Sequence, residues 1–234
     1  MKENIYTIPI NDAFDSDSEC PICEFFQKEE KGRVEYSLGA SMMEPDERIA
    51  SNELGYCVRH TQMMYDFGNK LSHALVLETR LKFLTEEIKK YRRNIKKPKS
   101  VFIKGKEVTG LSQSDNCLIC DRLDKIMNDF IANIFYLYKK ETEFKNKFLK
   151  SKGFCLKHFE MLVNSAYSSL GSQEGYEFIQ TLCDIEEKNL SRVTEEIEWF
   201  SKKFDYRYKD EDWKNSKDAV IRASRKISSY IEEK

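Results

Sequence analysis

The sequence predicts an all-α protein, built as a pseudo-twofold tandem repeat of long amphipathic helices with two Cys3His metal sites. Glycine and proline are scarce, at 9 and 4 of 234 residues, which disfavours strand-rich architectures with many tight turns. Apolar residues recur every three or four positions over long segments, which is the period of an amphipathic helix. Six of the seven cysteines and two of the three histidines lie in two phrases that each occur twice.

The composition is that of a soluble globular protein with a heavily charged surface, because 40% of the residues are hydrophobic and 34% are charged. The 39 lysines and arginines nearly balance the 40 aspartates and glutamates, so no global field favours nucleic acid. No segment is apolar enough for a secretory leader or a membrane span. We therefore expect a cytoplasmic protein, and in a reducing compartment a Cys/His pattern is more typical of metal binding than of disulfides.

The two repeated phrases are CxxC and GxCxxH. The first begins at Cys20 and recurs at Cys117, a shift of 97 residues, and the second contains Cys57 and then Cys155, a shift of 98. Such closely matched shifts indicate a tandem repeat. The two helical repeats are predicted to be 1–97, which includes an N-terminal arm, and 98–234, which ends in a C-terminal helix.

The ligand-type residues of these phrases are the predicted metal ligands. They are Cys20, Cys23, Cys57, His60, Cys117, Cys120, Cys155 and His158. Residues three apart on a tight turn, or in the first turn of a helix, point to one side, and thiolate with imidazole suits zinc. Gly55 and Gly153, two residues before a cysteine, can supply the positive φ that turns the chain into the site. Three cysteines and one histidine fill a tetrahedron, which is typical of a structural rather than a catalytic site.

The spacing alone leaves the pairing of the ligands open. Within a repeat, 33 residues separate Cys23 from Cys57, against 131 between Cys23 and Cys155. The fourfold longer loop costs only about 1 kcal/mol more in closure entropy, so a swapped arrangement or a shared binuclear cluster remains an alternative. We favour two separate sites within the repeats, because each repeat reproduces all four ligands.

Two redox alternatives use the same residues. Cysteine and histidine also hold iron–sulfur clusters, so ligand identity alone does not distinguish a cluster from zinc. A redox-active dithiol at Cys20 and Cys23 needs a βαβ context that the sequence lacks, and it leaves Cys57 and His60 without a role. We therefore favour two zinc ions. Cys183 has no ligand-type neighbour and is expected to be an ordinary core cysteine.

The first half is expected to contain three helices. An extended arm over 1–19 precedes a helix that ends near Leu38, and Pro45 opens a short helix. An apolar stripe over 61–95 predicts a helix about 50 Å long, with a break at Gly68, that requires a partner helix along its whole stripe.

The second half follows a predicted linker at 94–116. Helical spacing resumes in a long segment, weakens, and then returns in another long helix and a last helix whose start Trp213 would anchor. The corresponding ranges are 123–138, 144–148, 178–204 and 216–230.

Three further features carry weaker signals. The segment 89–106 holds nine basic residues and no acidic one, a pattern that suits nucleic acid, but a solvated helix end and linker is the preferred interpretation. The loop 42–48 has no counterpart in the second repeat and is interpreted as a turn held by caps and salt bridges. His73 is expected to pack on its helix rather than to be a ninth ligand.

Several stretches resemble an uncharacterised bacterial family of domains of unknown function. They are Ile5 to Phe14, the Cys-Pro-Ile-Cys phrase, Leu38 to Asp46, the Gly-Tyr-Cys-Val-Arg-His phrase, and Asp212 to Ala219. The resemblance covers nearly the whole chain. It implies a cysteine-rich, metal-binding protein and brings no established activity.

These observations predict a zinc-stabilised helical protein that acts as an interaction or regulatory module with a protein partner. The sequence has no nucleophile elbow, phosphate loop or dinucleotide fingerprint, so no catalysis is inferred. An iron–sulfur or dithiol redox protein, and nucleic-acid binding through 89–106, are the alternatives.

Overall fold

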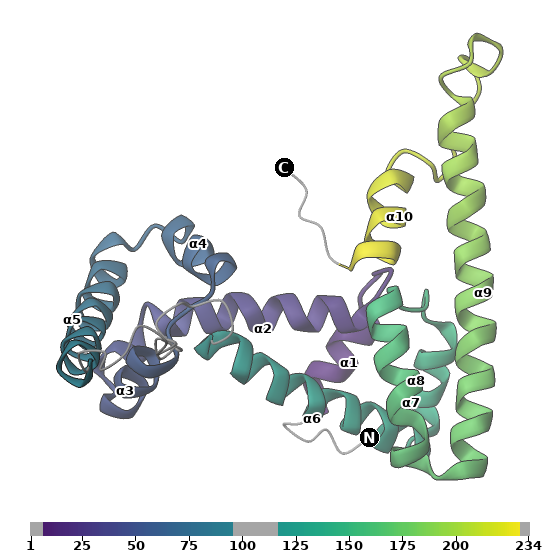
Figure 1. Ribbon diagram of the computed structural model, residues 1–234. Helices are drawn as coiled ribbons and strands as arrows, with labels where there is room; N and C mark the ends of the chain where they lie inside the picture. Colours follow the sequence, from purple (N-terminus) through teal and green to yellow (C-terminus); the bar gives the residue numbers. More distant parts are fainter. Residues whose placement is uncertain (1–6, 96–116, 230–234) are drawn as a thin grey trace, which may run out of the picture. The chain divides into compact units, whose positions relative to one another are not determined.

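The computed structural model describes residues 7–95 and 117–229, which form ten α-helices, two short 3-10 helices and no strand (Figure 1). The prediction of an all-α protein is confirmed. No helix in this part of the chain is long and apolar enough to cross a membrane. The helices are α1 (Ile8–Asp15), α2 (Pro21–Ser37), η1 (Ala40–Met43), α3 (Pro45–Leu54), α4 (Val58–Asp66), α5 (Lys70–Asn94), α6 (Leu118–Lys140), α7 (Thr142–Lys150), α8 (Leu156–Leu170), α9 (Ser172–Lys202), η2 (Tyr206–Tyr208) and α10 (Ala219–Ser228).

The chain divides into two compact units, and each unit draws on both predicted repeats. The first unit combines Met1–Gln27 with Met127–Lys234, and the second unit is Lys28–Ile126. The chain passes from the first unit into the second within α2 and returns within α6. These compact units differ from the sequential segments 1–97 and 98–234, and the tandem repeat itself stays a prediction.

Aromatic side chains form the core of the first unit. Phe14 of α1 lies edge-on to Phe144 of α7, with ring centroids 5.0 Å apart. Phe148 of α7 contacts both Phe154, at 5.4 Å, and Phe178 of α9, at 5.3 Å. All five rings are buried, and burying a phenylalanine side chain stabilises a fold by about 1.5–3 kcal/mol. Helices α8 and α10 both pack against the long α9 (Figure 1).

The predicted extended arm at 1–19 is wrong over residues 8–15, which form α1. Pro9 lies in the first turn, where its missing N–H leaves no helical hydrogen bond unmade. Ile10, Ala13 and Phe14 are buried on one face of this helix. Two turns are too few for the apolar period to emerge from the sequence, so only burial against the core identifies this helix.

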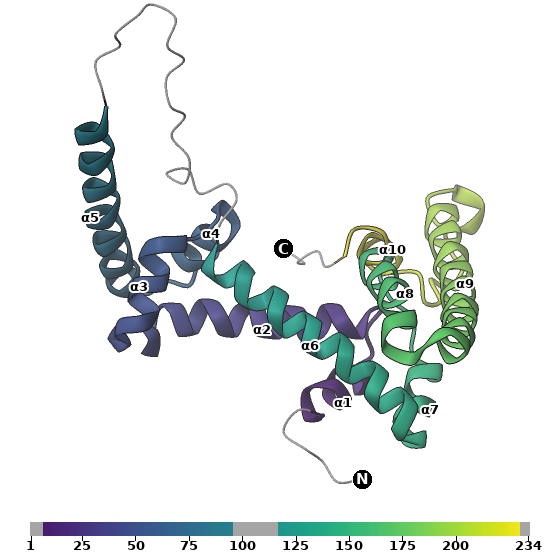
Figure 2. The same cartoon turned by 60° about the horizontal axis from the view of Figure 1, so that its bottom comes forward.

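The second unit is built on α3, α4 and α5, with α3 packed against α5 (Figure 2). Pro45 opens α3 as predicted. The predicted break at Gly68 is also confirmed, because its φ of 89° separates α4 from α5. The side chain of Asn69 caps α5 by accepting a hydrogen bond from the Ser72 backbone N–H. Buried aliphatic and thioether side chains outside α6 include Val34, Leu38, Met64 and Val76.

The predicted helices of the second half are confirmed, with small shifts at their ends. Helix α9 begins six residues before the predicted 178 and ends at Lys202. Trp213 lies 5.8 Å from Phe200 of α9, between ring centroids, and so anchors the segment that leads into α10. Most of the predicted linker and of the basic segment 89–106 lies outside the described residues.

Candidate metal centres

The eight predicted ligands gather in two groups of four, each with three thiols and one imidazole. Within each group the four donor atoms lie within 4.8 Å of one another. All members of one group belong to the first unit and all members of the other to the second. The α8 site is Cys20, Cys23, Cys155 and His158, and the α4 site is Cys57, His60, Cys117 and Cys120.

The preferred pairing within the repeats is therefore wrong, and the swapped arrangement is the one observed. The preference rested on the fact that each repeat reproduces all four ligands, and it took no account of the helices that fill the chain between Cys23 and Cys57. Helix α2, with 17 residues, is about 25 Å long, and α3, with 10 residues, is about 15 Å long. Because α3 is too short to bring the chain back along α2, the first CxxC meets the second GxCxxH instead.

Local backbone geometry presents the ligands in the same way at both sites. Cys57 and Cys155 are the N-cap residues of α4 and α8, and each histidine follows in the first turn of its helix. The glycines that precede these cysteines have positive φ, 68° at Gly55 and 79° at Gly153, as predicted. In the opposite CxxC turn of the α8 site, the Cys23 backbone N–H donates to the Cys20 carbonyl at 3.0 Å.

The distances between the donor atoms fit one tetrahedral ion at each site. Zn–S bonds of about 2.3 Å and Zn–N bonds of about 2.0 Å separate two sulfurs by about 3.8 Å, and sulfur from nitrogen by about 3.5 Å. The Sγ atoms of Cys23 and Cys155 are 3.6 Å apart, and those of Cys57 and Cys120 are 3.9 Å apart. Each histidine Nδ1 lies 3.2–3.4 Å from all three sulfurs of its site. The sulfurs are much too far apart for a disulfide, which needs about 2.05 Å.

At each site one thiol ionises readily, Cys155 in the α8 site and Cys117 in the α4 site, whereas the pKa values of neighbouring thiols are raised, so all three do not ionise together without a cation. In the α8 site, contact with Cys155 raises the pKa of Cys23 to about 12, and burial raises the pKa of Cys20 well above its usual value. In the α4 site, burial would raise the pKa of Cys117, but the contact with His60 outweighs it and brings the pKa to about 6. Three thiolates at one site repel one another, and a divalent cation is the group that would hold all three deprotonated.

A buried carboxylate orients the imidazole of the α4 site. His60 turns Nε2 toward Glu30 Oε1, at 3.1 Å, and Nδ1 toward the sulfurs. Arg59 holds the same carboxylate through two hydrogen bonds, of 2.9 and 2.7 Å. Burial would raise the pKa of Glu30, but these contacts outweigh it and lower the pKa to about 2. Burial would lower the pKa of His60, but the contacts with Cys117 and Glu30 outweigh it and raise the pKa to about 10, so a metal ion that binds Nδ1 displaces its proton while Glu30 holds the proton on Nε2.

The α8 site has a different set of neighbours, which act on the backbone and on one sulfur. The carboxylate of Glu186 accepts a hydrogen bond of 2.7 Å from the Phe154 backbone N–H. Lys226 of α10, which is 1% exposed, donates to the carbonyls of Lys152 and Phe154 at 2.5 and 3.3 Å and lies 3.3 Å from Glu186. Ser229 Oγ lies 3.3 Å from Cys155 Sγ. The turn that presents Cys155 is thus clamped between α9 and α10.

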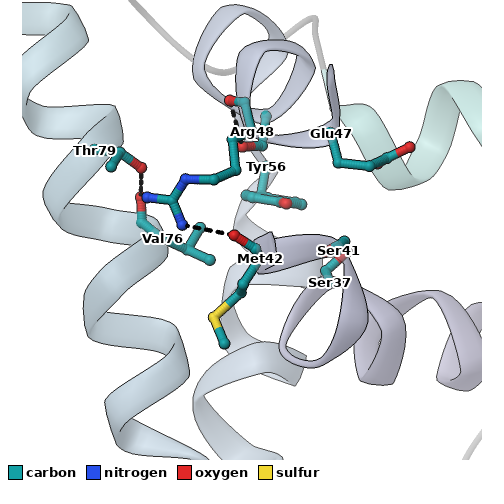
Figure 3. Close-up of a pocket in the computed structure, with 9 residues that line it drawn as sticks. Ser37, Ser41, Met42, Glu47, Arg48, Tyr56, Val76 and Thr79 are labelled. Atoms are coloured by element: carbon teal, nitrogen blue, oxygen red, sulfur yellow. Dashed lines mark hydrogen bonds between the residues drawn. The ribbon is translucent and has the colours of Figure 1, made fainter. Parts of the chain in front are cut away.

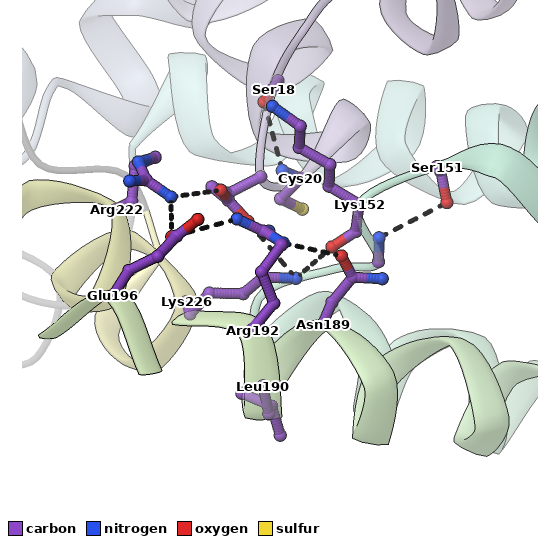
Figure 4. A network of polar contacts seen from close by, with 12 residues as sticks. Ser18, Cys20, Ser151, Lys152, Asn189, Leu190, Arg192, Glu196, Arg222 and Lys226 are labelled. Carbon is purple, nitrogen blue, oxygen red and sulfur yellow. Dashed lines mark hydrogen bonds and ion pairs between the residues drawn. The ribbon is translucent and has the colours of Figure 1, made fainter. Parts of the chain in front are cut away.

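A second charged network fixes the chain just before Cys20 (Figure 4). Glu19 is buried and pairs with Arg192 of α9 at 2.6 Å and with Arg222 of α10 at 3.5 Å. Arg222 also pairs with Glu196 of α9. Helices α9 and α10 therefore position both halves of the α8 site, the CxxC turn and the GxCxxH turn.

One family profile covers the chain from end to end. The profile of the family of unknown function DUF6062 matches residues 1–234. The chain belongs to this family. No curated protein and no solved structure matches it. The resemblance noted in the sequence is confirmed, and the two Cys/His groups are sites in a DUF6062 protein that are compatible with metal binding.

The sequence did not reveal the outer partners of either site in this DUF6062 chain. Glu30 and Glu186 lie in ordinary charged stretches of α2 and α9, and only the fold brings them to the sites. Arg59 lies inside the GxCxxH phrase, next to His60, and this was the one local signal available. Lys226 could be suspected only after its burial was known, since a lysine is almost never fully buried without partners.

The remaining candidates take structural roles. Cys183 is half-buried and His73 is buried, and both lie outside the two Cys/His groups. In the loop 42–48, Arg48 donates to the Met42 carbonyl at 3.3 Å (Figure 3). Glu47 pairs with Arg122 at 2.5 Å. The pocket beside this loop has a volume of about 10 Å³, enough for one water molecule. The interpretation of this stretch as a turn held by caps and salt bridges is confirmed only in part: residues 45–48 form the first turn of α3, Met43 is 83% exposed, and Glu44 makes no side-chain hydrogen bond as the N-cap.

Proposed function

We propose that this protein is a zinc-stabilised helical module, with one zinc ion in each unit, that acts through interaction with a protein partner in the cytoplasm. The proposal rests on one observation: eight cysteine and histidine donors form two closed groups at tetrahedral distances. Zinc bound there supplies the charge that holds three thiolates together and cross-links segments far apart in sequence. Four protein ligands leave no open position for a substrate, so the role is structural rather than catalytic.

The donor distances favour a single ion over an iron–sulfur cluster. Sulfurs 3.6 to 3.9 Å apart can share one metal ion. In a cluster the ligands bind different iron atoms with sulfide between them, which requires wider separation. Zinc is preferred over a mononuclear iron because it suits a tetrahedral set of thiolates and imidazole and needs no redox partner.

Nucleic-acid binding through 89–106 remains a weaker proposal. Only the first part of this segment is described, as the end of α5. There Lys89 pairs with Glu86 and Lys90 with Glu87, at 2.7 and 2.6 Å. These pairs reduce the positive charge available for phosphate contacts. Neutralising the lysines and arginines of this segment would abolish a salt-dependent gel shift if the proposal holds, and leave it unaltered if it fails.

Two measurements on one sample test the main proposal. The protein is purified anaerobically without added metal, and its metal content and its absorption spectrum are then measured. Two zinc ions per chain and no visible band are expected. Cys57→Ser and Cys155→Ser should each lose one ion, while the matched control Cys183→Ser should keep both. Iron and sulfide, with a visible absorption band that bleaches on reduction, would show that the sites hold iron–sulfur clusters instead of zinc. Protein that contains no metal would overturn the proposal.

A further inference from the structure

Helix α5 carries an apolar pattern that the metal sites and the core do not use. Residues 77–95, which run from α5 to its extended C-cap residue Ile95, contain six apolar residues spaced alternately by four and three positions, which is the a/d spacing of a coiled-coil heptad. These residues, here called the α5 seam, are Leu77, Leu81, Leu84, Ile88, Tyr91 and Ile95.

The α5 seam lies largely in solvent. Leu81 is 63% exposed, Ile88 is 54% exposed and Ile95 is 60% exposed. A different, neighbouring face of α5 is buried, and it includes Val76 and Arg80. Arg80 donates to the Asn52 and Glu53 carbonyls of α3, which assigns that buried face to contact with α3. Figure 2 shows that α5 continues past the end of α3, so the seam is not the surface that α3 covers.

We propose that the α5 seam binds the same seam of a second copy of this chain, in a parallel two-stranded coiled coil. The identity of the residues favours this occupant. Within the helix the a positions hold Leu81 and the β-branched Ile88, Ile95 follows as the C-cap residue, and the d positions hold Leu77, Leu84 and Tyr91. β-branched residues at a, combined with leucine at d, favour two parallel strands over three or four.

Charges beside the seam are complementary in the same arrangement. With a at Leu81 and Ile88, Glu87 occupies a g position and Arg92 the following e position. In a parallel dimer the g residue of one helix meets the next e residue of the other, so Glu87 of each copy faces Arg92 of its partner. Both residues lie at the edge of the seam, where such pairs choose the partner and its orientation. An antiparallel dimer would instead bring Glu87 to Arg80, which α3 already engages.

The helical part of the seam, from Leu77 to Tyr91, is about 21 Å long, or two heptads, so the dimer is expected to be weak, with a Kd on the order of 10–100 µM. This inference deepens the proposed role as an interaction module. It rests on that role in one respect, since the second unit must hold its metal for α3 to support α5.

Sedimentation velocity of the full chain over about 1 to 200 µM tests the proposal, with the metal content measured on the same samples. We expect a monomer at the lowest concentration and a dimer at the highest. Ile88→Glu should remain monomeric throughout. Leu71→Glu is the matched control, because Leu71 is 73% exposed on α5 but lies outside the seam, and this variant should dimerise like the parent protein.

Exchange of charges tests the orientation. Glu87→Arg should weaken the dimer by about tenfold, because two arginine pairs then face each other across the seam. The double variant Glu87→Arg, Arg92→Glu should restore the affinity of the parent protein. A parent chain that stays monomeric with two zinc ions bound would overturn the dimer and leave the metal proposal standing. A dimer without bound metal would overturn the metal proposal and the stated dependence of α5 on the metal, while the seam contact itself would stand. Equal loss of dimer in Leu71→Glu and Ile88→Glu would overturn the seam as the contact surface. A double variant without rescue would rule out the parallel arrangement.

Discussion

The two sites share one set of donor residues but differ in how far the surrounding protein could hold its fold without them. All four ligands of the α8 site are buried, beside a core of packed phenylalanines. In the α4 site Cys57 and Cys120 are half-exposed, and the second unit buries fewer apolar side chains than the first. A metal ion would therefore reinforce a large core in the first unit and substitute for part of a core in the second.

The side chains that contact the donor residues from outside each Cys/His group also differ between the two sites. At the α4 site Glu30 and Arg59 act on the imidazole of His60, so they tune the ligand itself. At the α8 site Glu186 and Lys226 act on the backbone of the turn before Cys155, so they shape the chain that carries the ligand. One site should be sensitive to changes in ligand chemistry and the other to changes in backbone packing.

Metal removal should produce the largest effect and should separate the two units. A structural zinc ion contributes on the order of 10 kcal/mol, comparable with the whole stability of a small domain. With a strong chelator we expect the second unit to unfold and the first unit to retain much of its helical structure. Hydrogen exchange read by mass spectrometry would show α3, α4 and α5 losing protection, while α8 and α9 keep part of theirs.

Protein mixed with a metal-saturated form of the same chelator is the control for non-specific effects. If α5 and α9 lost hydrogen-exchange protection equally, the two units would depend equally on their metal ions for stability. The contrast between a reinforced core and a substituted one would then be abandoned.

Gly153→Ala should destabilise the α8 site more than Gly171→Ala, although both glycines have positive φ, at 79° and 84°. The positive φ alone costs alanine on the order of 1–3 kcal/mol at either position, and at Gly171 it comes with a ψ of 179°, a combination that is essentially confined to glycine. A Cβ on Gly153 would also collide with the Glu186 carboxylate and lie 3.0 Å from Lys226 Nζ, whereas nothing lies within 4 Å at Gly171. Displacing that buried pair adds on the order of 2 kcal/mol.

Chemical denaturation of the two metal-loaded variants measures this difference. Equal stability of the two alanine variants would show that the clamp of Glu186 and Lys226 yields easily. The stability of the α8 site would then not depend on the packing of the backbone turn before Cys155.

Glu30→Gln should weaken metal binding at the α4 site by about 10- to 100-fold and leave the α8 site unchanged. Glutamine still accepts a hydrogen bond from His60 Nε2, but it lacks the charge that raises the basicity of the imidazole. Glu35→Gln, at an exposed position on the same helix, is the matched control. Competition with a chromogenic chelator gives both affinities, and a loss shared by the two sites would contradict the local role of Glu30.

Much of this architecture follows from the sequence because it depends on local rules. The helical period, the Pro45 start and the positive φ at Gly55 and Gly153 are properties of a few adjacent residues. The eight ligands follow from spacings of three. What failed was the pairing, because it depends on where rigid helices of about 25 and 15 Å carry the chain. The contacts of Glu30 and Lys226 were missed for the same reason, since they join residues 30 and about 70 positions apart.

Ser229→Ala should give the smallest effect and should touch the α8 site alone. The hydroxyl lies 3.3 Å from Cys155 Sγ, and a single hydrogen bond to a thiolate contributes about 1 kcal/mol. Its loss should speed metal release from this site by a few-fold, which makes the α8 site slightly more like the half-exposed α4 site.

Cadmium-substituted protein gives one NMR resonance for each site, and only one should shift. Ser224→Ala removes a hydroxyl from α10, the helix that Ser229 follows, where it donates to the Val220 carbonyl, and should shift neither. A shift of both resonances in Ser229→Ala would mean that the two sites are coupled, and the comparison between them would have to be redrawn as one between two ends of a single cooperative structure.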